Sequence, residues 1–387
     1  MKAVRLVSMF YFNSNIAGKD MFLVPKYLSD YLGAKGEIVY PKWAENADFG
    51  NEYRGVKLVP IRSLSKFHST LWSEKEMIWW LLKNSKNIDV LCLFWLNPRN
   101  IFFANIYKML NRKGVCYVKA DLGYTDFTKI SVNGIKGYFK NYFSKVVDIY
   151  SVETERNYLA IKDGALGDQM KNSTVFMSNG FDIELFEKFN IAKRDFNEKE
   201  SLLITVGRIG HKEKNNEMML QALDGIDMMD WKFMLVGNIE DDFLNVFEDF
   251  ILRNPDKKDK VILTGGIYDR EKLWDIYNRA KAFVLTSPKE GMPIVFSEAL
   301  AFGNFIITTN VSGSSEISDN GRLGKIVDVG DVDALRIALC DLFTGKLDLE
   351  TNYKSAIKLS DAKFNWRKLV EAVGDRIKHI KEVIILR

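Results

Sequence analysis

Short apolar runs alternate with segments of helical periodicity along nearly the whole chain, and this alternation restricts the fold more than any other feature. Residues 22–32, 75–83 and 216–223 are examples of the helical segments. Such alternation is typical of parallel sheets joined by right-handed crossover helices. The predicted strands cover residues 4–12, 37–40, 56–60, 90–95, 115–120, 149–152, 174–177, 201–206, 231–236, 260–263, 282–286, 305–309 and 325–327.

This number of strands is too large for one compact sheet, so we predict an α/β fold with two Rossmann-like, doubly wound domains. The 387 residues, of which 47% are hydrophobic, suffice for two cores. The N-terminal domain is predicted to cover residues 1–190 and the C-terminal domain residues 191–363, with the border in the charged stretch 188–200. Ligands of open parallel sheets bind beyond the carboxyl ends of the strands, so we expect an active site in a cleft between the domains.

The charge of the chain is unevenly distributed. The formal net charge of +4 is too small to indicate a nucleic-acid partner. Residues 1–190 carry 26 Lys and Arg against 19 Asp and Glu, which leaves 29 against 32 for the remainder (55 − 26 and 51 − 19). A basic N-terminal half suits an anionic acceptor or an anionic membrane face, and it is equally compatible with ordinary solvated lysines.

Cysteine usage and hydropathy favour a cytoplasmic protein. Cys92, Cys116 and Cys340 lack metal-ligand spacing, and their odd number argues against a disulfide framework. No apolar run approaches the roughly 18 residues that a membrane span needs. Residues 135–145 interleave Lys with aromatic side chains at helical spacing. This pattern fits either a helix at the inner face of the membrane or, as the favoured reading, a domain helix packed on its sheet.

The motif that indicates function lies at residues 286–303, where a predicted strand is followed by a loop and a helix. Glu290 and Gly291 close the loop, and Pro293 suits a first helical turn. A glycine before a helix exposes backbone N–H groups where the helix dipole adds positive charge, which favours a phosphate. Glu290 and Glu298 bracket this point, and a carboxylate binds a sugar diol through two strong hydrogen bonds. The motif therefore predicts a nucleotide-sugar site.

This stretch resembles the E-x7-E motif of retaining glycosyltransferase family 4, whose members have the GT-B fold. Gly207-Arg208, followed by Lys214, resembles the family's Gly-Arg…Lys signature, in which both cations bind the donor diphosphate. The gap between Arg and Lys has one more residue than in many members, so Lys212 is an alternative to Lys214. Residues 179–182 resemble the Asn-Gly-x-Asp that precedes the linker of the family. The resemblance also implies that a C-terminal helix within residues 364–387 crosses back onto the first domain.

The same resemblance implies the residues that bind the donor. Ile267, which follows Gly265 and Gly266, is expected to contact the nucleobase through its main chain. The complete set of expected donor-binding residues is Gly18, Gly207, Arg208, Lys214, Ile267, Glu290, Gly291, Met292, Pro293, Ile294, Val295 and Glu298.

The acceptor side is less well defined by the sequence. The loop after the first strand carries one glycine, Gly18, where family members usually carry two. We expect Gly18 to approach the transferred sugar or a phosphate. Asp121 follows the strand at 115–120 and either binds a sugar hydroxyl or caps a turn. Glu153 and Glu155 resemble a strand end of the family, which implies a structural or acceptor-facing role. The expected catalytic residues are Arg208, Lys214, Glu290 and Asp121.

No metal and no cofactor are expected. The only Asp-x-Asp, at Asp331 and Asp333, precedes a helical segment, where Asp331 is expected to cap the helix. His68, His211 and His379 lack ligand spacing. The charge of the leaving group would then be neutralised by Arg208, Lys214 and helix N-termini.

The sequence thus predicts a retaining, metal-independent glycosyltransferase. It would transfer a sugar from a nucleotide sugar, with a UDP-hexose or UDP-HexNAc as the preferred donor. The acceptor would be a glycan or lipid-linked glycan in cell-surface polysaccharide or glycolipid biosynthesis. One alternative is a catalytically silent GT-B protein that binds a glycan or a partner. Another is a dinucleotide oxidoreductase, which the absence of G-x-G-x-x-G after the first strand disfavours.

Overall fold

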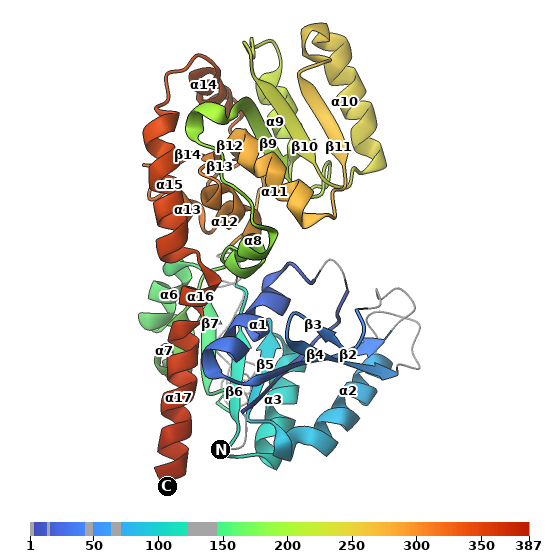
Figure 1. The fold of residues 1–387 in the computed structure, drawn as a ribbon, viewed down its shortest axis with the longest axis vertical. Coiled ribbons are helices and arrows are strands. Elements are labelled where there is room, and N and C mark those ends of the chain that lie inside the picture. The colour runs from blue at the N-terminus through green and yellow to red at the C-terminus, as the bar shows by residue number, and fades with distance from the viewer. Residues whose placement is uncertain (1–3, 14–15, 43–48, 63–70, 123–144, 387) are drawn as a thin grey trace. The chain divides into compact units, whose positions relative to one another are not determined.

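The computed structural model describes residues 4–13, 16–42, 49–62, 71–122 and 145–386. The chain divides into two compact units (Figure 1). The N-terminal unit comprises Met1–Asp182 together with Trp366–Arg387, and the C-terminal unit comprises Ile183–Asn365. The first border therefore lies at residue 182, where the sequence predicted 190, and the second lies at 365, where it predicted 363.

The N-terminal unit contains an eight-stranded sheet in the order β3-β4-β2-β1-β5-β6-β7-β8. All neighbours are parallel except β3 and β4. The seven strands predicted in this half all form, whereas β3, which has two residues, is too short to produce a hydrophobic pattern. The strands are β1 (Arg5–Met9), β2 (Lys35–Lys42), β3 (Glu52–Tyr53), β4 (Val56–Arg62), β5 (Val90–Phe94), β6 (Val115–Lys119), β7 (Ile149–Val152) and β8 (Thr174–Phe176).

Helices cover this sheet, and the C-terminal helix returns to it as predicted. In α17 Lys381 pairs with Asp89 at 2.8 Å, and Trp366, which is completely buried, stacks on Tyr27 of α1 with ring centroids 6.5 Å apart. The helices are α1 (Asp20–Leu32), α2 (Leu71–Asn84), α3 (Pro98–Leu110), α6 (Glu155–Lys162), α7 (Asp168–Ser173), α16 (Trp366–Leu369) and α17 (Glu371–Leu386).

The central strands of this sheet are buried on both faces. Every residue of β5 and β6 is buried, which explains why these segments read as continuous apolar runs instead of alternating ones. Cys92 and Cys116 lie in these strands as free thiols, and burial raises the pKa of Cys92 to about 12. These two cysteines are therefore unreactive core residues.

The C-terminal unit contains a six-stranded parallel sheet in the order β11-β10-β9-β12-β13-β14. The order reverses between β9 and β12, as in a dinucleotide-binding sheet. All six strands predicted here form: β9 (Glu200–Val206), β10 (Lys232–Val236), β11 (Val261–Gly265), β12 (Ala280–Leu285), β13 (Phe305–Thr309) and β14 (Gly324–Val327). The helices are α8 (Ile183–Phe189), α9 (Asn216–Leu223), α10 (Asp241–Arg253), α11 (Arg270–Arg279), α12 (Ile294–Ala301), α13 (Ser314–Ile317), α14 (Val332–Phe343) and α15 (Leu349–Lys363).

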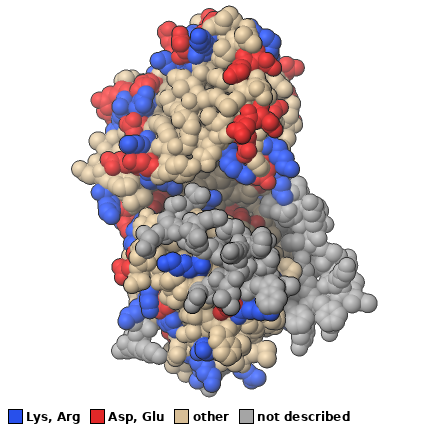
Figure 2. Space-filling model, turned by 90° about the vertical axis from the view of Figure 1, so that its right-hand side faces the viewer, with Lys and Arg blue, Asp and Glu red and all other residues tan. Residues whose placement is uncertain are grey.

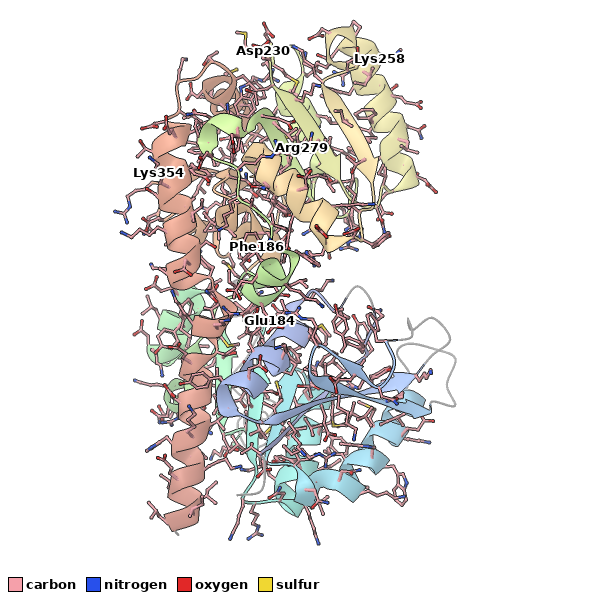
Figure 3. The ribbon with its side chains drawn as sticks, viewed as in Figure 1. Glu184, Phe186, Asp230, Lys258, Arg279 and Lys354 are labelled. Atoms are coloured by element: carbon pink, nitrogen blue, oxygen red, sulfur yellow. The ribbon has the colours of Figure 1, made fainter. Side chains whose placement is uncertain are left out.

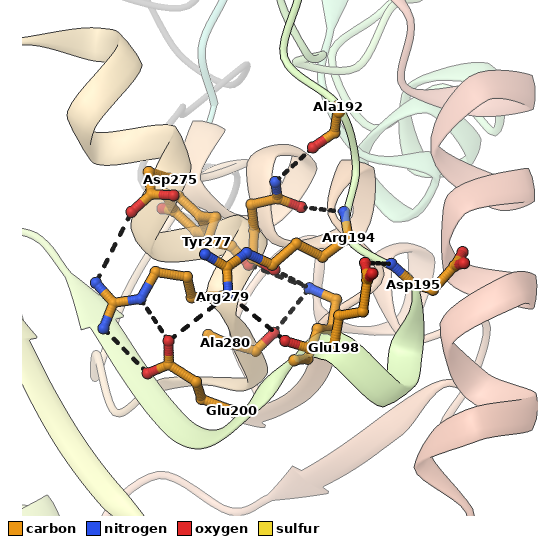
Figure 4. Close-up of polar contacts among 11 residues, drawn as sticks. Ala192, Arg194, Asp195, Glu198, Glu200, Asp275, Tyr277, Arg279 and Ala280 are labelled. Carbon is orange, nitrogen blue, oxygen red and sulfur yellow. Dashed lines mark hydrogen bonds and ion pairs between the residues drawn. The ribbon is translucent and has the colours of Figure 1, made fainter.

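The segment that leads into β9 is anchored on the end of α11. The buried Lys199 donates to the carbonyl oxygens of Asn278 and Ala280 at 2.8 and 2.9 Å, and Arg279 pairs with Glu200 at 2.7 Å (Figure 4). The last carbonyl groups of a helix lack hydrogen-bond donors within the helix, and the ammonium group of Lys199 supplies donors for them. Burial lowers the pKa of Lys199 to about 7.

Aromatic packing holds α8 on the same unit. Phe186, labelled in Figure 3, lies 6.2 Å from Trp274 of α11 and 5.8 Å from Phe302, measured between ring centroids. Among the helices that the structure describes, none is both long enough and apolar enough to cross a bilayer.

Candidate functional site

The predicted donor residues other than Gly18 and Ile267 lie beyond the carboxyl ends of β9 and β12. The order of strands reverses between these two, which is the position where open α/β sheets usually bind their ligands. Residues 207–215 follow β9, and residues 286–293 follow β12. Both segments belong to the C-terminal unit.

The loop after β9 depends on two glycines. Gly207 donates its N–H to the carbonyl of Val236 at 3.0 Å. Gly237 has a φ of 148°, and a Cβ there would lie 1.6 Å from the carbonyl oxygen of Gly207. Only glycine permits this close approach of the two backbones. The aliphatic part of the Lys214 side chain packs over Gly207. A Cβ added to Gly207 would lie 3.5 Å from Cε of Lys214.

Lys214 and Glu290 meet in the structure although 76 residues separate them. The Nζ of Lys214 lies 2.5 Å from Oε1 of Glu290, and the hydroxyl of Ser287 donates to the same oxygen at 2.6 Å. The hydroxyl of Thr286 donates to the carbonyl of Lys214 at 3.0 Å and so ties the two loops together. Lys212, the alternative cation, is exposed.

Arg208 is half-exposed and forms surface contacts within its own loop. Its Nη2 lies 2.5 Å from Oε2 of Glu213, and its Nη1 lies 3.1 Å from Nε2 of His211. An exposed ion pair of this kind contributes little stability, so an anionic ligand can replace Glu213 as the partner of Arg208. His211 is a polar residue of the same loop.

Glu298 projects from α12 and is almost completely buried. Its Oε1 accepts from Nη1 of Arg270 at 2.5 Å and from Nε1 of Trp274 at 3.1 Å. Arg270 and Trp274 are four residues apart on α11 and therefore lie on one face of that helix. Sequence reasoning missed both residues, although their spacing directly after the Gly265-Gly266 turn was the available signal.

The remaining donor residues surround the start of α12 and the end of β11. The helix begins at Ile294, so Pro293 is its N-cap instead of its first helical residue. Met292 is buried, and its Sδ lies 2.5 Å from where a Cβ on Gly313 would be. Gly291, Ile294, Val295 and Ile267 are all half-buried.

Gly18 and Asp121, the two site residues predicted in the N-terminal unit, lie in segments that the first residue of α1 connects. Gly18 lies in the turn before α1, and Asp20, the first residue of α1, lies 3.1 Å from Nζ of Lys119 at the end of β6. Asp121 follows two residues later, is exposed, and accepts from Nε1 of Trp95 at 2.9 Å. The structure therefore brings the loop after β1 to the end of β6.

Asp331 caps α14, as predicted from its position before a helical segment. Its Oδ1 accepts from the N–H of Ala334 at 2.8 Å. In the ranges that the structure describes, no group of three or more His, Cys, Asp or Glu side chains is placed to hold a metal ion.

Comparison with known protein families gives a match within the C-terminal unit. Residues 186–359 match the family described as glycosyl transferases group 1. The chain is 28% identical over 208 residues to the capsular polysaccharide biosynthesis glycosyltransferase CapM of Staphylococcus aureus, which covers 50% of this chain and 52% of CapM. It is 29% identical over 183 residues to a UDP-Gal:alpha-D-GlcNAc-diphosphoundecaprenol alpha-1,3-galactosyltransferase of Escherichia coli, covering 44% and 45% of the two chains. The chain thus spans about half the length of these curated relatives.

Solved structures match nearly the whole chain. Sucrose-phosphate synthase from Thermosynechococcus elongatus superposes with a TM-score of 0.73 at 15% identity, covering 98% of this chain and all of that one. Anabaena Alr3699/HepE in complex with UDP and glucose gives a TM-score of 0.70 at 12% identity, covering 97% and 100%. This likeness confirms the predicted GT-B fold.

Proposed function

We propose that this protein is a retaining, metal-independent glycosyltransferase of the family 4 type. It transfers a sugar from a UDP-hexose or UDP-HexNAc to a hydroxyl of a growing glycan in cell-surface polysaccharide or glycolipid biosynthesis. The match of residues 186–359 to glycosyl transferases group 1 and the GT-B fold support the general activity. The donor, the stereochemistry and the acceptor rest on the site itself.

One observation carries the proposal: Lys214 and Glu290 form an ion pair at the point where the strand order of the C-terminal sheet reverses. A cation for the diphosphate and a carboxylate for the sugar stand there side by side. The start of α12 follows within four residues of Glu290 and adds backbone N–H groups and positive dipole charge. A nucleoside diphosphate sugar needs this combination.

Each residue then has a distinct role. Arg208 and Lys214 bind the diphosphate, with Gly207 and the residues from Gly291 to Val295 supplying close backbone contacts. Glu298, held by Arg270 and Trp274, binds the ribose, and the main chain at Ile267 contacts the base. Glu290 binds hydroxyls of the transferred sugar. HepE, one of the similar structures, has been solved with UDP, which supports UDP as the nucleotide.

The reaction is a front-face substitution at the anomeric carbon. The bond from this carbon to the phosphate oxygen breaks as the bond to the acceptor oxygen forms on the same face. The departing diphosphate takes the proton of the acceptor hydroxyl. Arg208, Lys214 and the α12 N-terminus stabilise the negative charge that develops on the diphosphate, which is the step where fixed donors contribute most.

A glycan, free or lipid-linked, is the proposed acceptor. The similar enzyme of Escherichia coli acts, by its name, on a sugar carried by diphosphoundecaprenol. In this chain Gly18 and Asp121 supply the acceptor side, where the loop after β1 meets the end of β6. Asp121 is exposed there and can accept a hydrogen bond from a sugar hydroxyl.

The proposed function is tested by ligand binding and donor breakdown in the presence of excess EDTA. UDP and a UDP-sugar are expected to raise the melting temperature more than the GDP and ADP counterparts, and the enzyme is expected to release UDP from the UDP-sugar. Activity that requires added Mg²⁺ or Mn²⁺ would contradict metal independence. Binding without any turnover would instead support the catalytically silent alternative.

We also propose that the protein, located in the cytoplasm, contacts the inner face of an anionic membrane. Residues 135–145, the segment that first indicated this contact, lie almost entirely outside the described residues. Helices α2 and α3 pack on one core, yet Trp79, Leu82, Phe102 and Met109 on these helices are exposed. Residues 75–113 carry seven Lys and Arg against two Asp and Glu. In Figure 2 the described surface of the N-terminal unit likewise shows more extensive blue than red.

Replacing Trp79 and Phe102 by serine is expected to weaken binding to phosphatidylglycerol vesicles by about tenfold or more. Burial of a large apolar side chain contributes roughly 1.5–3 kcal/mol, and the basic residues add a salt-dependent attraction. Co-sedimentation with vesicles measures the change, and Ile337→Ser, an exposed apolar position of the C-terminal unit, is the control. Equal binding to neutral phosphatidylcholine vesicles, or no difference between the variants, would refute this contact.

A further inference from the structure

A cluster of buried charges lies at the carboxyl ends of β6 and β7. Lys119 is completely buried, and its Nζ lies 2.6 Å from Oε1 of Glu153 and 3.1 Å from Oδ2 of Asp20. Glu153, which directly follows β7, is 1% exposed. Taking two charges out of water is costly, and an apolar pair of the same volume is often at least as stable. The pair therefore calls for an explanation beyond the stability of the fold.

Glu153 uses only one of its two oxygens within the described protein. Oε1 accepts from Nζ of Lys119 and from the backbone N–H of Asp121 at 3.1 Å. Oε2 is buried, and no donor for it exists among the described residues. A buried carboxylate oxygen without a donor is destabilising by more than a typical hydrogen bond contributes. A hydroxyl of a ligand would satisfy it.

The neighbouring backbone is held in an uncommon conformation. Asp121 has a φ of 46° and Trp95, at the end of the adjacent strand β5, has a φ of 71°. Neither residue is glycine, and such conformations persist where the surroundings enforce them, often at functional sites. The backbone N–H of Asp121 donates to Glu153, and Nε1 of Trp95 donates to the carboxylate of Asp121 at 2.9 Å. The two contacts fix where the carboxylate of Asp121 points.

The charges of this cluster depend on one another. Burial by itself lowers the pKa of Lys119, but Glu153, Asp20 and Asp121 reverse the effect and hold it above its usual range. Burial raises the pKa of Glu153 to about 7, although Lys119 opposes this. Lys119 therefore stays charged near neutral pH, and its charge favours the ionised form of Glu153 against the effect of burial on the pKa of this carboxyl.

We propose that the Lys119–Glu153 pair positions the acceptor: Glu153 fixes Asp121 through its backbone N–H, and its second oxygen binds the attacking hydroxyl group. The site lies at the carboxyl ends of the neighbouring strands β6 and β7 (Figure 1), where Asp20 at the start of α1 reaches Lys119. Lys119 acts through Glu153 and does not touch the acceptor. The inference rests on the proposed glycosyl transfer and names the residues that hold the attacking group. In donor hydrolysis, a water molecule takes the place of the sugar hydroxyl.

The test compares Glu153→Gln, Lys119→Met and the double variant Lys119→Met/Glu153→Gln. UDP release from UDP-glucose and UDP-N-acetylglucosamine is measured together with UDP affinity by calorimetry. Each variant is expected to release UDP about tenfold more slowly or worse, while UDP affinity stays within about twofold, because the cluster lies on the acceptor side. The double variant removes both charges of the Lys119–Glu153 pair together and leaves only the partly exposed Asp20 without this lysine, so it keeps the test valid if a single variant does not fold.

Lys108→Met is the matched control. Lys108 pairs with Asp148 at 2.8 Å, near the amino ends of β6 and β7. Replacing Lys108 therefore tests whether the loss of any ion pair beside this sheet lowers the rate. The pH profile adds a readout that a purely structural role would not change. Glu153 faces Lys119, Asp20 and Asp121, and it is protonated as the pH falls through about 7. The wild-type rate should therefore decrease below this pH. In Glu153→Gln this decrease at acid pH should be absent.

The outcomes separate this inference from the proposed function. Wild-type rates in the double variant, or an equal loss in Lys108→Met, would overturn the positioning role alone. A loss of UDP affinity as large as the loss of rate would also overturn it, because the pair would then act on the donor or on folding. Failure of the wild-type protein to bind UDP and to turn over either UDP-sugar would overturn the proposed function, and the inference with it.

Discussion

Arg208→Ala is expected to lower sugar transfer and donor hydrolysis by about a hundredfold or more. This corresponds to a loss of about 2.7 kcal/mol of transition-state stabilisation. Arg208 lies in the loop after β9 that also carries Lys214, and its guanidinium offers a planar fork to a diphosphate. Among the described residues, the polar contacts of its guanidinium are with the side chains of His211 and Glu213 at the surface. Its removal should therefore reduce activity without reducing stability.

The comparison that isolates this role uses a second exposed arginine of the same unit. Arg322 pairs with Asp319 at 2.6 Å and is 75% exposed, so Arg322→Ala removes the same kind of surface ion pair far from β9 in the sequence. Steady-state rates and melting temperatures are measured for both variants. Rates near those of the wild type in Arg208→Ala would remove its assigned role. A lower melting temperature in that variant alone would point to folding instead.

The strands could be predicted because they are buried on both faces and therefore form distinct apolar runs. This holds for β5 and β6 in one sheet and for β12 and β13 in the other, where every residue but one is buried. Among the described strands the exception is β3, whose two residues give no hydrophobic pattern. The GT-B fold followed from the alternation and the motifs together, and the likeness to solved structures confirms it.

The partners of the site residues could not be predicted in the same way. Glu298 meets Arg270 and Trp274 because α12 packs against α11, and Lys119 meets Glu153 because β6 and β7 are neighbours in the sheet. Strand order is decided by long-range packing, and the local sequence does not contain it. For the same reason the sequence left Lys212 and Lys214 as alternatives. In the structure Lys214 pairs with Glu290, which supports Lys214 as the diphosphate ligand.

The two glutamates of the motif are expected to affect different parts of the donor. Glu298→Gln should weaken UDP binding by about tenfold or more, because a charge-assisted hydrogen bond to the ribose contributes roughly 1.5–3 kcal/mol. Glu290→Gln should leave UDP affinity nearly unchanged but depress transfer strongly, because we propose that its carboxylate binds the transferred sugar. The surroundings of the two residues agree with this division. Glu298 is buried and fixed by α11, whereas Glu290 is more accessible and pairs with Lys214.

Calorimetry of UDP against both variants, with donor hydrolysis measured beside it, decides between these roles. Glu298→Gln also weakens the ion pair with Arg270, so its melting temperature must be recorded, and Arg270→Lys separates the two effects by retaining the charge on α11. Glu217→Gln, an exposed position on α9, serves as the control for loss of a carboxylate in this unit. An equal loss of UDP binding in both motif variants, or in neither, would mean that the two carboxylates do not divide ribose from sugar. If the division holds, the Lys214–Glu290 pair marks the junction between the diphosphate and the sugar that is transferred.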